Sequence, residues 1–124
     1  MELHLPHQHA DTDEAVKLSA QLERTEDFQA VSEVFKQLSD SSRVRIFWLL
    51  CHCEECVMNI SALVNMSSPA VSHHLRQLKS SGLIVSRREG KEVYYKTADT
   101  EESQLLHRTI EKIMTMTCPQ SVHL

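Results

Sequence analysis

Residues 68–82 read SPAVSHHLRQLKSSG, and this stretch determines the fold class that the sequence predicts. Ser67 or Ser68 is a suitable N-cap for a helix whose first turn accepts Pro69, because a missing N–H costs nothing there. Gly82 follows at the point where a helix end favours a residue with a positive φ angle. Three apolar side chains recur at helical spacing and give this helix one apolar side: Val71, Leu75 and Leu78.

The opposite side of the same helix carries hydrogen-bond donors and positive charges, which suit base edges and phosphates in a DNA groove. The candidate DNA-contacting residues on this helix are Ser68, Ser72, His73, Arg76, Gln77 and Lys79. Before it, residues 59–67 (NISALVNMS) predict a shorter helix and a tight turn, with Ile60, Leu63 and Val64 facing inward. Two helices joined in this way are typical of a helix-turn-helix.

A β-hairpin is predicted directly after the second helix. Residues 83–86 and 92–96 are rich in strand-forming side chains, and residues 89–90 (Glu-Gly) provide a turn between them. Basic residues gather at the tip, where a wing that holds DNA phosphates needs positive charge: Arg87, Arg88 and Lys91. The predicted fold class is therefore mainly α with a small β-hairpin wing, a winged helix-turn-helix.

The net charge of −4 conceals an uneven distribution. Residues 68–96 hold six basic and two acidic side chains, whereas residues 1–40 hold three basic and nine acidic ones. Positive charge thus lies where DNA contact is predicted, and the local field matters more there than the total. No apolar run approaches the roughly 18 residues of a membrane span, and no signal peptide is recognisable. We expect a cytoplasmic protein whose four thiols stay reduced.

Two stretches resemble a known family most closely. Residues 72–84 (SHHLRQLKSSGLI) and 88–95 (REGKEVYY) are the most specific parts of a run from Asp40 to Tyr95 that resembles the ArsR/SmtB family of metal-responsive bacterial repressors. The resemblance covers the middle half of the chain. It implies a homodimer paired through its terminal helices, which leaves double-stranded operator DNA when a metal ion or another inducer binds.

Further helices are predicted on both sides of this run. Residues 14–25 predict the first, Asp27 is the expected cap of the second, and Asp40 or Ser39 caps the third; residues 99–117 predict the last. The apolar stripe of the second helix consists of Phe28, Val31, Val34, Phe35 and Leu38. The expected organisation is a flexible His-containing arm over residues 1–13, a DNA-binding and dimerisation domain over 14–118 and a tail over 119–124.

Residues 51–59 (CHCEECVMN) carry the chemistry expected of an effector site. Three cysteines within six residues, interleaved with histidine and glutamate, favour binding of a thiophilic ion such as Zn(II), Cd(II), Pb(II) or As(III). The resembling family often has Cys-Val-Cys before the turn; Cys56 matches its first cysteine and Met58 replaces the second. The candidate metal ligands are Cys51, Cys53 and Cys56, completed by His4, His7, His9 or Cys118.

Other uses of these residues remain open. Cys53 and Cys56 form a C-x-x-C that an oxidant or persulfide would close, which predicts a redox-sensing repressor. A small thiol oxidoreductase needs this motif in a βαβ context, which flanking helices do not provide, so neither enzyme activity nor a small organic substrate is expected. A purely structural zinc ion predicts unfolding by a chelator. The histidines of the arm also fit a disordered tail.

The terminal helix offers a second place to look for metal. Some members of the resembling family bind zinc through an Asp-x-His near the start of this helix and a His-x-x-His/Glu eleven residues on. Asp99 matches, but Glu101 and Lys112 replace the two histidines, so we do not expect this site. His107 and Glu111 lie one turn apart, and we interpret them as a salt bridge or solvated pair rather than as metal ligands.

Overall fold

The computed structural model describes residues 3–118, and the predicted tail over residues 119–124 lies outside them. The described chain forms two compact units that divide between Phe35 and Lys36. Within residues 3–118 no helix has both the length and the apolar character that a membrane span requires.

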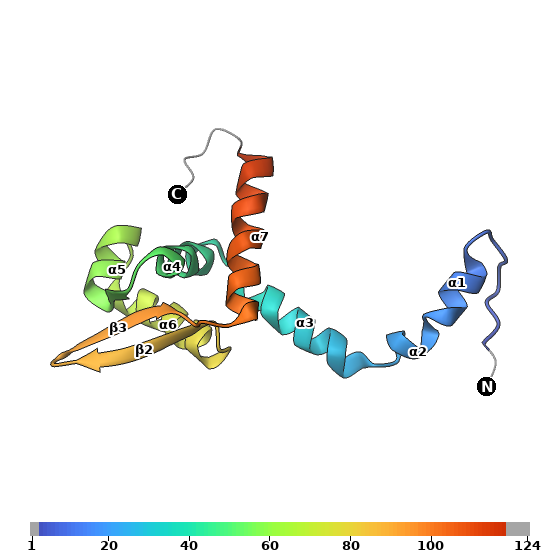
Figure 1. Cartoon of the computed structure of the whole chain (residues 1–124), viewed down its shortest axis with the longest axis horizontal. Helices are drawn as coiled ribbons and strands as arrows, with labels where there is room; N and C mark the ends of the chain where they lie inside the picture. The colour runs from blue at the N-terminus through green and yellow to red at the C-terminus, as the bar shows by residue number, and fades with distance from the viewer. Residues whose placement is uncertain (1–2, 119–124) are drawn as a thin grey trace. The chain divides into compact units, whose positions relative to one another are not determined.

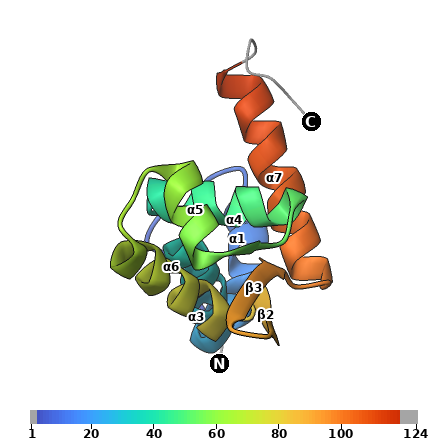
Figure 2. The same cartoon turned by 90° about the vertical axis from the view of Figure 1, so that its left-hand side faces the viewer.

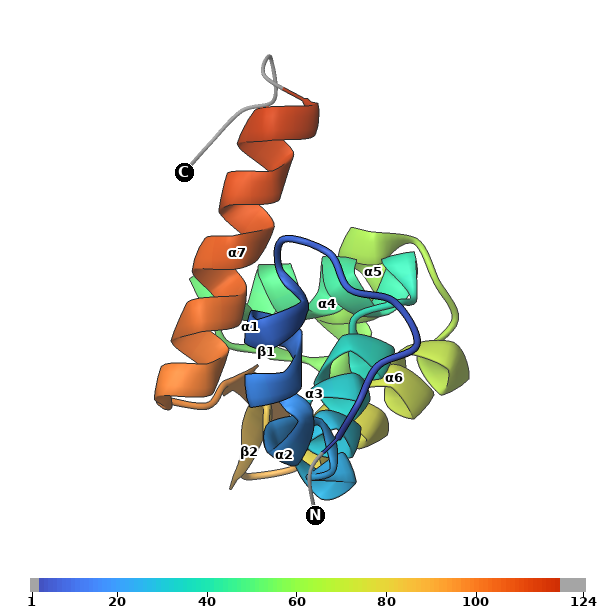
Figure 3. The same ribbon diagram turned by 90° about the vertical axis from the view of Figure 1, so that its right-hand side faces the viewer.

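The first unit contains two short helices in place of the single helix predicted over residues 14–25. These are α1 (Thr12–Lys17) and α2 (Ser19–Leu22), which Figure 3 shows in succession. Ser19 Oγ donates to the carbonyl oxygen of Val16 at 2.7 Å, and such a local bond competes with the helical ladder. The prediction of a continuous helix was therefore wrong at this point.

The helix α3 (Thr25–Gln37) follows and begins before its predicted cap. Asp27 lies in the first turn of α3, where the helix dipole stabilises a carboxylate, and it pairs with Arg24 at 2.9 Å. The predicted apolar stripe is present on α3, and part of it is exposed. Its exposed members are Phe28 (48 % exposed), Val31 (52 %) and Phe35 (65 %).

The second unit is a winged helix-turn-helix, as predicted. Its helices are α4 (Ser41–His52), α5 (Val57–Val64), α6 (Ser68–Ser80) and α7 (Glu101–Thr117). Its strands are β1 (Glu55–Cys56), β2 (Ile84–Glu89) and β3 (Glu92–Thr97), antiparallel in the order β1-β3-β2. Figure 1 shows β2 and β3 projecting as a hairpin beside α6, and Figure 2 shows α5 and α6 joined by their turn.

Local signals place the ends of these helices. Asp40 caps α4 by accepting from the backbone N–H of Arg43 at 3.0 Å, and Ser67 caps α6 through the N–H of Ala70 at 3.3 Å. Asn65 ends α5 in the left-handed region, with φ of 56°. These caps fix where the turn lies and therefore how α6 is presented.

Both glycines occupy backbone conformations that need them. Gly82 has φ of 80° just after α6, and Gly90 has φ of 62° in the tight hairpin turn between Glu89 and Glu92. L-residues with a side chain rarely adopt such angles, so each glycine permits the turn predicted at its position.

The core of the second unit lies where α4, α5 and α6 meet the base of the hairpin. Its fully buried side chains include Ile46, Phe47, Ile60, Val71, Leu75, Leu78 and Leu83. The prediction that Leu63 faces inward was wrong, since this side chain is 60 % exposed. Ile60 and Val64 lie one turn apart on α5 and alone fill its core-facing side.

The strand β1 was not predicted, and it joins the segment after α4 to the wing. Glu55 lies opposite Tyr95 and Cys56 lies opposite Tyr94 in the antiparallel ladder. The cysteine-rich stretch thus belongs to the same sheet as the wing.

We expect the change Leu75→Ala to lower the free energy of unfolding by about 2–5 kcal/mol, because Leu75 is only 1 % exposed and its removal leaves a cavity. Urea unfolding at fixed protein concentration measures the change. The matched control is Leu22→Ala at a position that is 63 % exposed, which is expected to cost less than about 0.5 kcal/mol. Equal losses in the two variants would contradict the core described above.

Candidate nucleic-acid interface and effector sites

The polar side of α6 is open to solvent. His73, Arg76 and Lys79 are exposed, and Ser68, Ser72 and Gln77 are half-buried along the same helix. Within residues 3–118, the Arg76 guanidinium takes part in no ion pair, whereas the Lys79 ammonium donates to Ser86 Oγ at 2.7 Å. Six donors along one helix can follow base edges and phosphates.

The three basic residues predicted to hold phosphate have different surroundings. Arg87 donates to Glu54 at 2.7 Å and to Glu89 at 2.7 Å, and its guanidinium lies 4.9 Å from the ring centroid of Tyr94. These carboxylates raise the pKa of Arg87, and Arg87 lowers the pKa of Glu54. No ion pair engages Arg88 or Lys91 in the described part of the chain. Of these three residues, Arg88 and Lys91 are thus the cations available to phosphate.

A polar network lies beneath α6. The guanidinium of Arg43 donates from Nε to His74 Nδ1 at 3.2 Å and from one terminal nitrogen to Gln37 Oε1 at 3.0 Å. The bond to Nδ1 places the proton of neutral His74 on Nε2, which lies 3.9 Å from Asp40. The first turn of α4 therefore holds α6 through a buried histidine. Sequence reasoning missed His74.

The four cysteines form no disulfide and differ in exposure. Cys56 is buried on β1. Cys53 is exposed, and the Sγ atom of Cys53 lies 3.5 Å from the carbonyl oxygen of Leu49. Burial, reinforced by Glu111, raises the pKa of Cys51 to about 12, and burial with Glu55 also raises the pKa of Cys53. Cys51 is therefore the thiol least ready to supply a thiolate.

The other predicted metal ligands lie at the two ends of the described chain. His4, His7 and His9 belong to the exposed segment before α1, where the rings of His7 and His9 stack with centroids 6.0 Å apart. Cys118 is exposed at the C-cap of α7. None of the predicted ligands forms a group of three close donors within residues 3–118.

One three-donor cluster does occur among the described residues, and it consists of His52, His107 and Glu111. His52 ends α4, while the other two lie one turn apart on α7. The predicted contact between His107 and Glu111 is present at 3.2 Å. Sequence reasoning missed His52 as its third member, because only the fold brings the end of α4 to α7.

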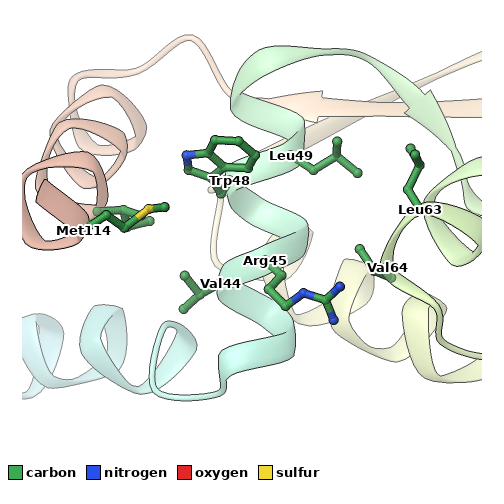
Figure 4. A pocket seen from close by; sticks show the side chains of 8 residues that line it. Val44, Arg45, Trp48, Leu49, Leu63, Val64 and Met114 are labelled. Carbon is green, nitrogen blue, oxygen red and sulfur yellow. The ribbon is translucent and has the colours of Figure 1, made fainter. Parts of the chain in front are cut away.

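An apolar pocket of about 400 Å³ lies beside this cluster. Figure 4 shows Val44 and Trp48 from α4, Leu63 and Val64 from α5, and Met114 from α7 around it. Leu63 is thus exposed toward this pocket rather than buried in the core. On α7 further apolar side chains are exposed, namely Leu105, Ile113 and Met116.

Comparison with known proteins agrees with this architecture. The family model described as bacterial regulatory protein, arsR family, matches residues 40–86. A CadC homolog from Staphylococcus aureus, named a cadmium resistance transcriptional regulatory protein, is 42 % identical over 79 residues, which cover 63 % of this chain and 65 % of that protein. A homolog of the transcriptional repressor SmtB from Synechocystis is 38 % identical over 85 residues, covering 68 % and 64 % respectively.

A solved structure extends the similarity to nearly the whole chain. The homodimeric winged helix-turn-helix DNA-binding domain Mb0332 from Mycobacterium bovis, a possible ArsR-family regulator, superposes with a TM-score of 0.64 at 27 % identity, covering 97 % of this chain and 99 % of that one. Together with the fold and the helix-turn-helix match, these similarities place the chain in a class of winged-helix proteins whose matched members are named transcriptional regulators. The chain belongs to the ArsR/SmtB family.

The buried histidine under α6 predicts a pH dependence of stability. Burial lowers the pKa of His74, and the nearby Asp40 carboxylate only partly opposes this effect. The unfolded chain, with a histidine pKa of about 6.5, therefore takes up the proton at higher pH than the folded chain does. Its contribution to stability is complete above pH of about 6.5 and is lost as the pH falls toward the folded pKa.

We expect wild-type protein to lose more stability than His74→Gln does between pH of about 7.5 and 5.5. Urea midpoints measured across this range give the comparison. His73→Gln, at an exposed position of the same helix, is the matched control and should keep most of the wild-type pH dependence, because His73 contributes least to the lowered pKa of His74. If His74→Gln also kept it, the histidine would not carry the effect.

Proposed function

We propose that this protein is a homodimeric repressor that binds operator DNA through α6 and the wing, and that a thiophilic metal ion acts as its inducer. The observation that carries the DNA-binding part is the solvent-open polar side of α6, presented by a family-matched helix-turn-helix and flanked by Arg88 and Lys91 of the wing. The chain spans just under two thirds of the length of the CadC and SmtB homologs that it matches.

Dimerisation is supported by the apolar faces that one chain leaves uncovered. Phe28, Val31 and Phe35 are exposed on α3, and Ile113 and Met116 are exposed on α7. Apolar side chains exposed along a helix in this number are typical of surfaces that meet a partner. The similar structure from Mycobacterium bovis is homodimeric. A second copy of this chain is the partner we propose for these faces.

In the proposed complex, the two α6 helices enter successive major grooves of a pseudo-palindromic operator, about 34 Å apart. Ser68, Ser72, His73, Arg76 and Gln77 would contact base edges or nearby phosphates. Lys79, Arg88 and Lys91 would hold the DNA backbone, as would Arg87 when phosphate replaces its carboxylate partners.

The proposed inducer site contains Cys53 and Cys56, whose thiolates suit thiophilic ions. The structure supports a route from this stretch to the wing: Cys56 lies opposite Tyr94 in the sheet, and Glu54 holds Arg87 at 2.7 Å. Residues of the arm, or Cys118, would complete the ligand set, because no group of three close donors among residues 3–118 includes Cys53 or Cys56. The proposed Cys118, His4, His7 and His9 ligands would then come from moving segments or a second chain.

An ion bound there would shift the segment that carries β1 and therefore the wing. By linkage, metal and DNA must weaken each other's binding by the same factor. The ion supplies only this differential binding; no chemical step is needed.

We expect Lys91→Ala to weaken binding to operator and to unrelated DNA alike, because a phosphate contact carries no sequence information. The slope of log K against log salt concentration should become shallower by about 0.9 for each phosphate that the variant no longer neutralises. Fluorescence anisotropy with the two DNAs over a range of salt concentrations measures both effects. Lys112→Ala, a cation on α7 outside the proposed interface, should leave the slope unchanged. Weakening confined to the operator would contradict the phosphate role of Lys91.

We expect reduced, metal-free protein to give a saturable ultraviolet thiolate-to-metal band with Cd(II), and Cys56→Ser to abolish most of it. Cys51→Ser is the matched control, since its thiol has a pKa of about 12 and should contribute little. A band in wild-type protein justifies operator-release assays with each metal. No band at stoichiometric Cd(II) would refute the thiolate inducer site and favour the redox-sensing repressor, in which oxidation of Cys53 and Cys56 releases DNA reversibly.

A further inference from the structure

We infer that His52, His107 and Glu111 form a second metal site, separate from the cysteines, that binds a divalent ion such as Zn(II) or Co(II) between α4 and α7. This site does not depend on the proposed function, because its ligands include none of the proposed inducer ligands. Its support is the geometry of three donor atoms and the side chain that orients one of them.

The three donor atoms form a nearly equilateral triangle. His52 Nε2 lies 3.3 Å from Glu111 Oε1, His107 Nε2 lies 3.2 Å from the same oxygen, and the two nitrogens lie 3.2 Å apart. A tetrahedral zinc ion with bonds of about 2.0–2.1 Å holds its ligand atoms about 3.3–3.4 Å apart. The spacing of the three donor atoms therefore matches one face of a zinc tetrahedron.

Hydrogen bonds alone do not satisfy this triangle. If both Nε2 atoms carry protons for Glu111, the two N–H groups face each other at 3.2 Å without an acceptor between them. If only one is protonated, its N–H can donate to the carboxylate or to the other nitrogen, but the lone pair of that other nitrogen and the carboxylate oxygen then face each other with no proton between them. One cation at the centre accepts all three lone pairs at once, which explains why these groups can converge.

Trp48 orients the carboxylate by a hydrogen bond to the same oxygen that faces the two histidines. Its indole Nε1 donates to Glu111 Oε1 at 3.1 Å, and its ring lies 4.5 Å from the ring of His52. Outer hydrogen bonds of this kind fix the position of a metal-bound carboxylate and typically change metal affinity 10- to 100-fold. The cluster thus has three ligands and one positioning residue, all supplied by α4 and α7.

The donor set selects the class of ion. Two imidazoles and one carboxylate suit Zn(II) and its spectroscopic substitute Co(II) better than they suit Cd(II), Pb(II) or As(III), the softer of the ions that thiolates bind. The side chains of His52, His107 and Glu111 are 22 %, 29 % and 23 % exposed, so water can reach the ion and complete the tetrahedron. A bound ion would join the end of α4 to α7. Three protein ligands and one open position are also the arrangement of catalytic zinc sites.

Co(II) titration of the metal-free full-length protein tests the site. We expect visible d–d absorption with the intensity of four-coordinate Co(II), without a thiolate-to-metal band that tracks it. His52→Ala and His107→Ala should each weaken this binding more than about tenfold, and Trp48→Phe about tenfold. His73→Ala, an exposed histidine of α6, is the matched control and should leave the titration unchanged.

Trp48 is the only tryptophan of the chain, and its emission gives an independent readout. Paramagnetic Co(II) at the site should quench it, and Zn(II) should displace Co(II) and reverse the quenching. His107→Gln serves as a second variant should His107→Ala fail to fold, as judged by circular dichroism. The Cys53→Ser background should keep both signals.

The second metal site is refuted if wild-type protein gives no four-coordinate Co(II) spectrum, or if the spectrum survives both histidine substitutions. It is equally refuted if the only absorption is a thiolate band that Cys53→Ser removes. These results are distinguishable from failure of the proposed inducer site, which is measured by Cd(II) and Cys56→Ser.

Discussion

Burial of one side of α4 is the constraint on which the rest of the second unit depends. Ile46, Phe47 and Leu50 are at most 2 % exposed, and they fix the rotation of the helix about its own axis. Burying such side chains contributes about 1.5–3 kcal/mol each, so no other rotation of α4 competes. Once α4 is fixed, its first turn lies under α6, and its last turn lies against α7. The candidate DNA interface and the inferred metal site therefore lie at the two ends of the same helix.

The helix-turn-helix was predictable because its signals are local. The Ser67 cap, Pro69 in the first turn and Gly82 after the last one each act on the backbone within a few residues, and the structure confirms all three. The hairpin was predictable for the same reason, since Gly90 supplies the turn. The break before Ser19 and the side on which Leu63 lies were predicted wrongly, because they depend on a side-chain bond and on neighbouring packing.

The sites were less predictable because their members are far apart in sequence. His52 and His107 are separated by 55 residues, and the glutamate that neutralises Arg87 lies 33 residues before it. No spacing rule joins such residues; only the packing of α4 against α7 and the short strand β1 does so. Sequence reasoning therefore identified the cysteine-rich stretch as a candidate metal site and recognised His107 and Glu111 as a pair. It did not find the three-donor cluster that this pair forms with His52.

The exposed apolar side chains of α3 affect how the protein behaves at the low concentrations typical of a regulator. A chain that exposes Phe28, Val31 and Phe35 until it meets a second copy has a stability that depends on its own concentration. For the proposed dimer, dilution separates the chains, and the separated chains present these side chains to proteases and to other apolar surfaces. The concentration of functional dimer would then depend on both the synthesis and the degradation of the chain. It would rise more steeply than the total concentration of the chain.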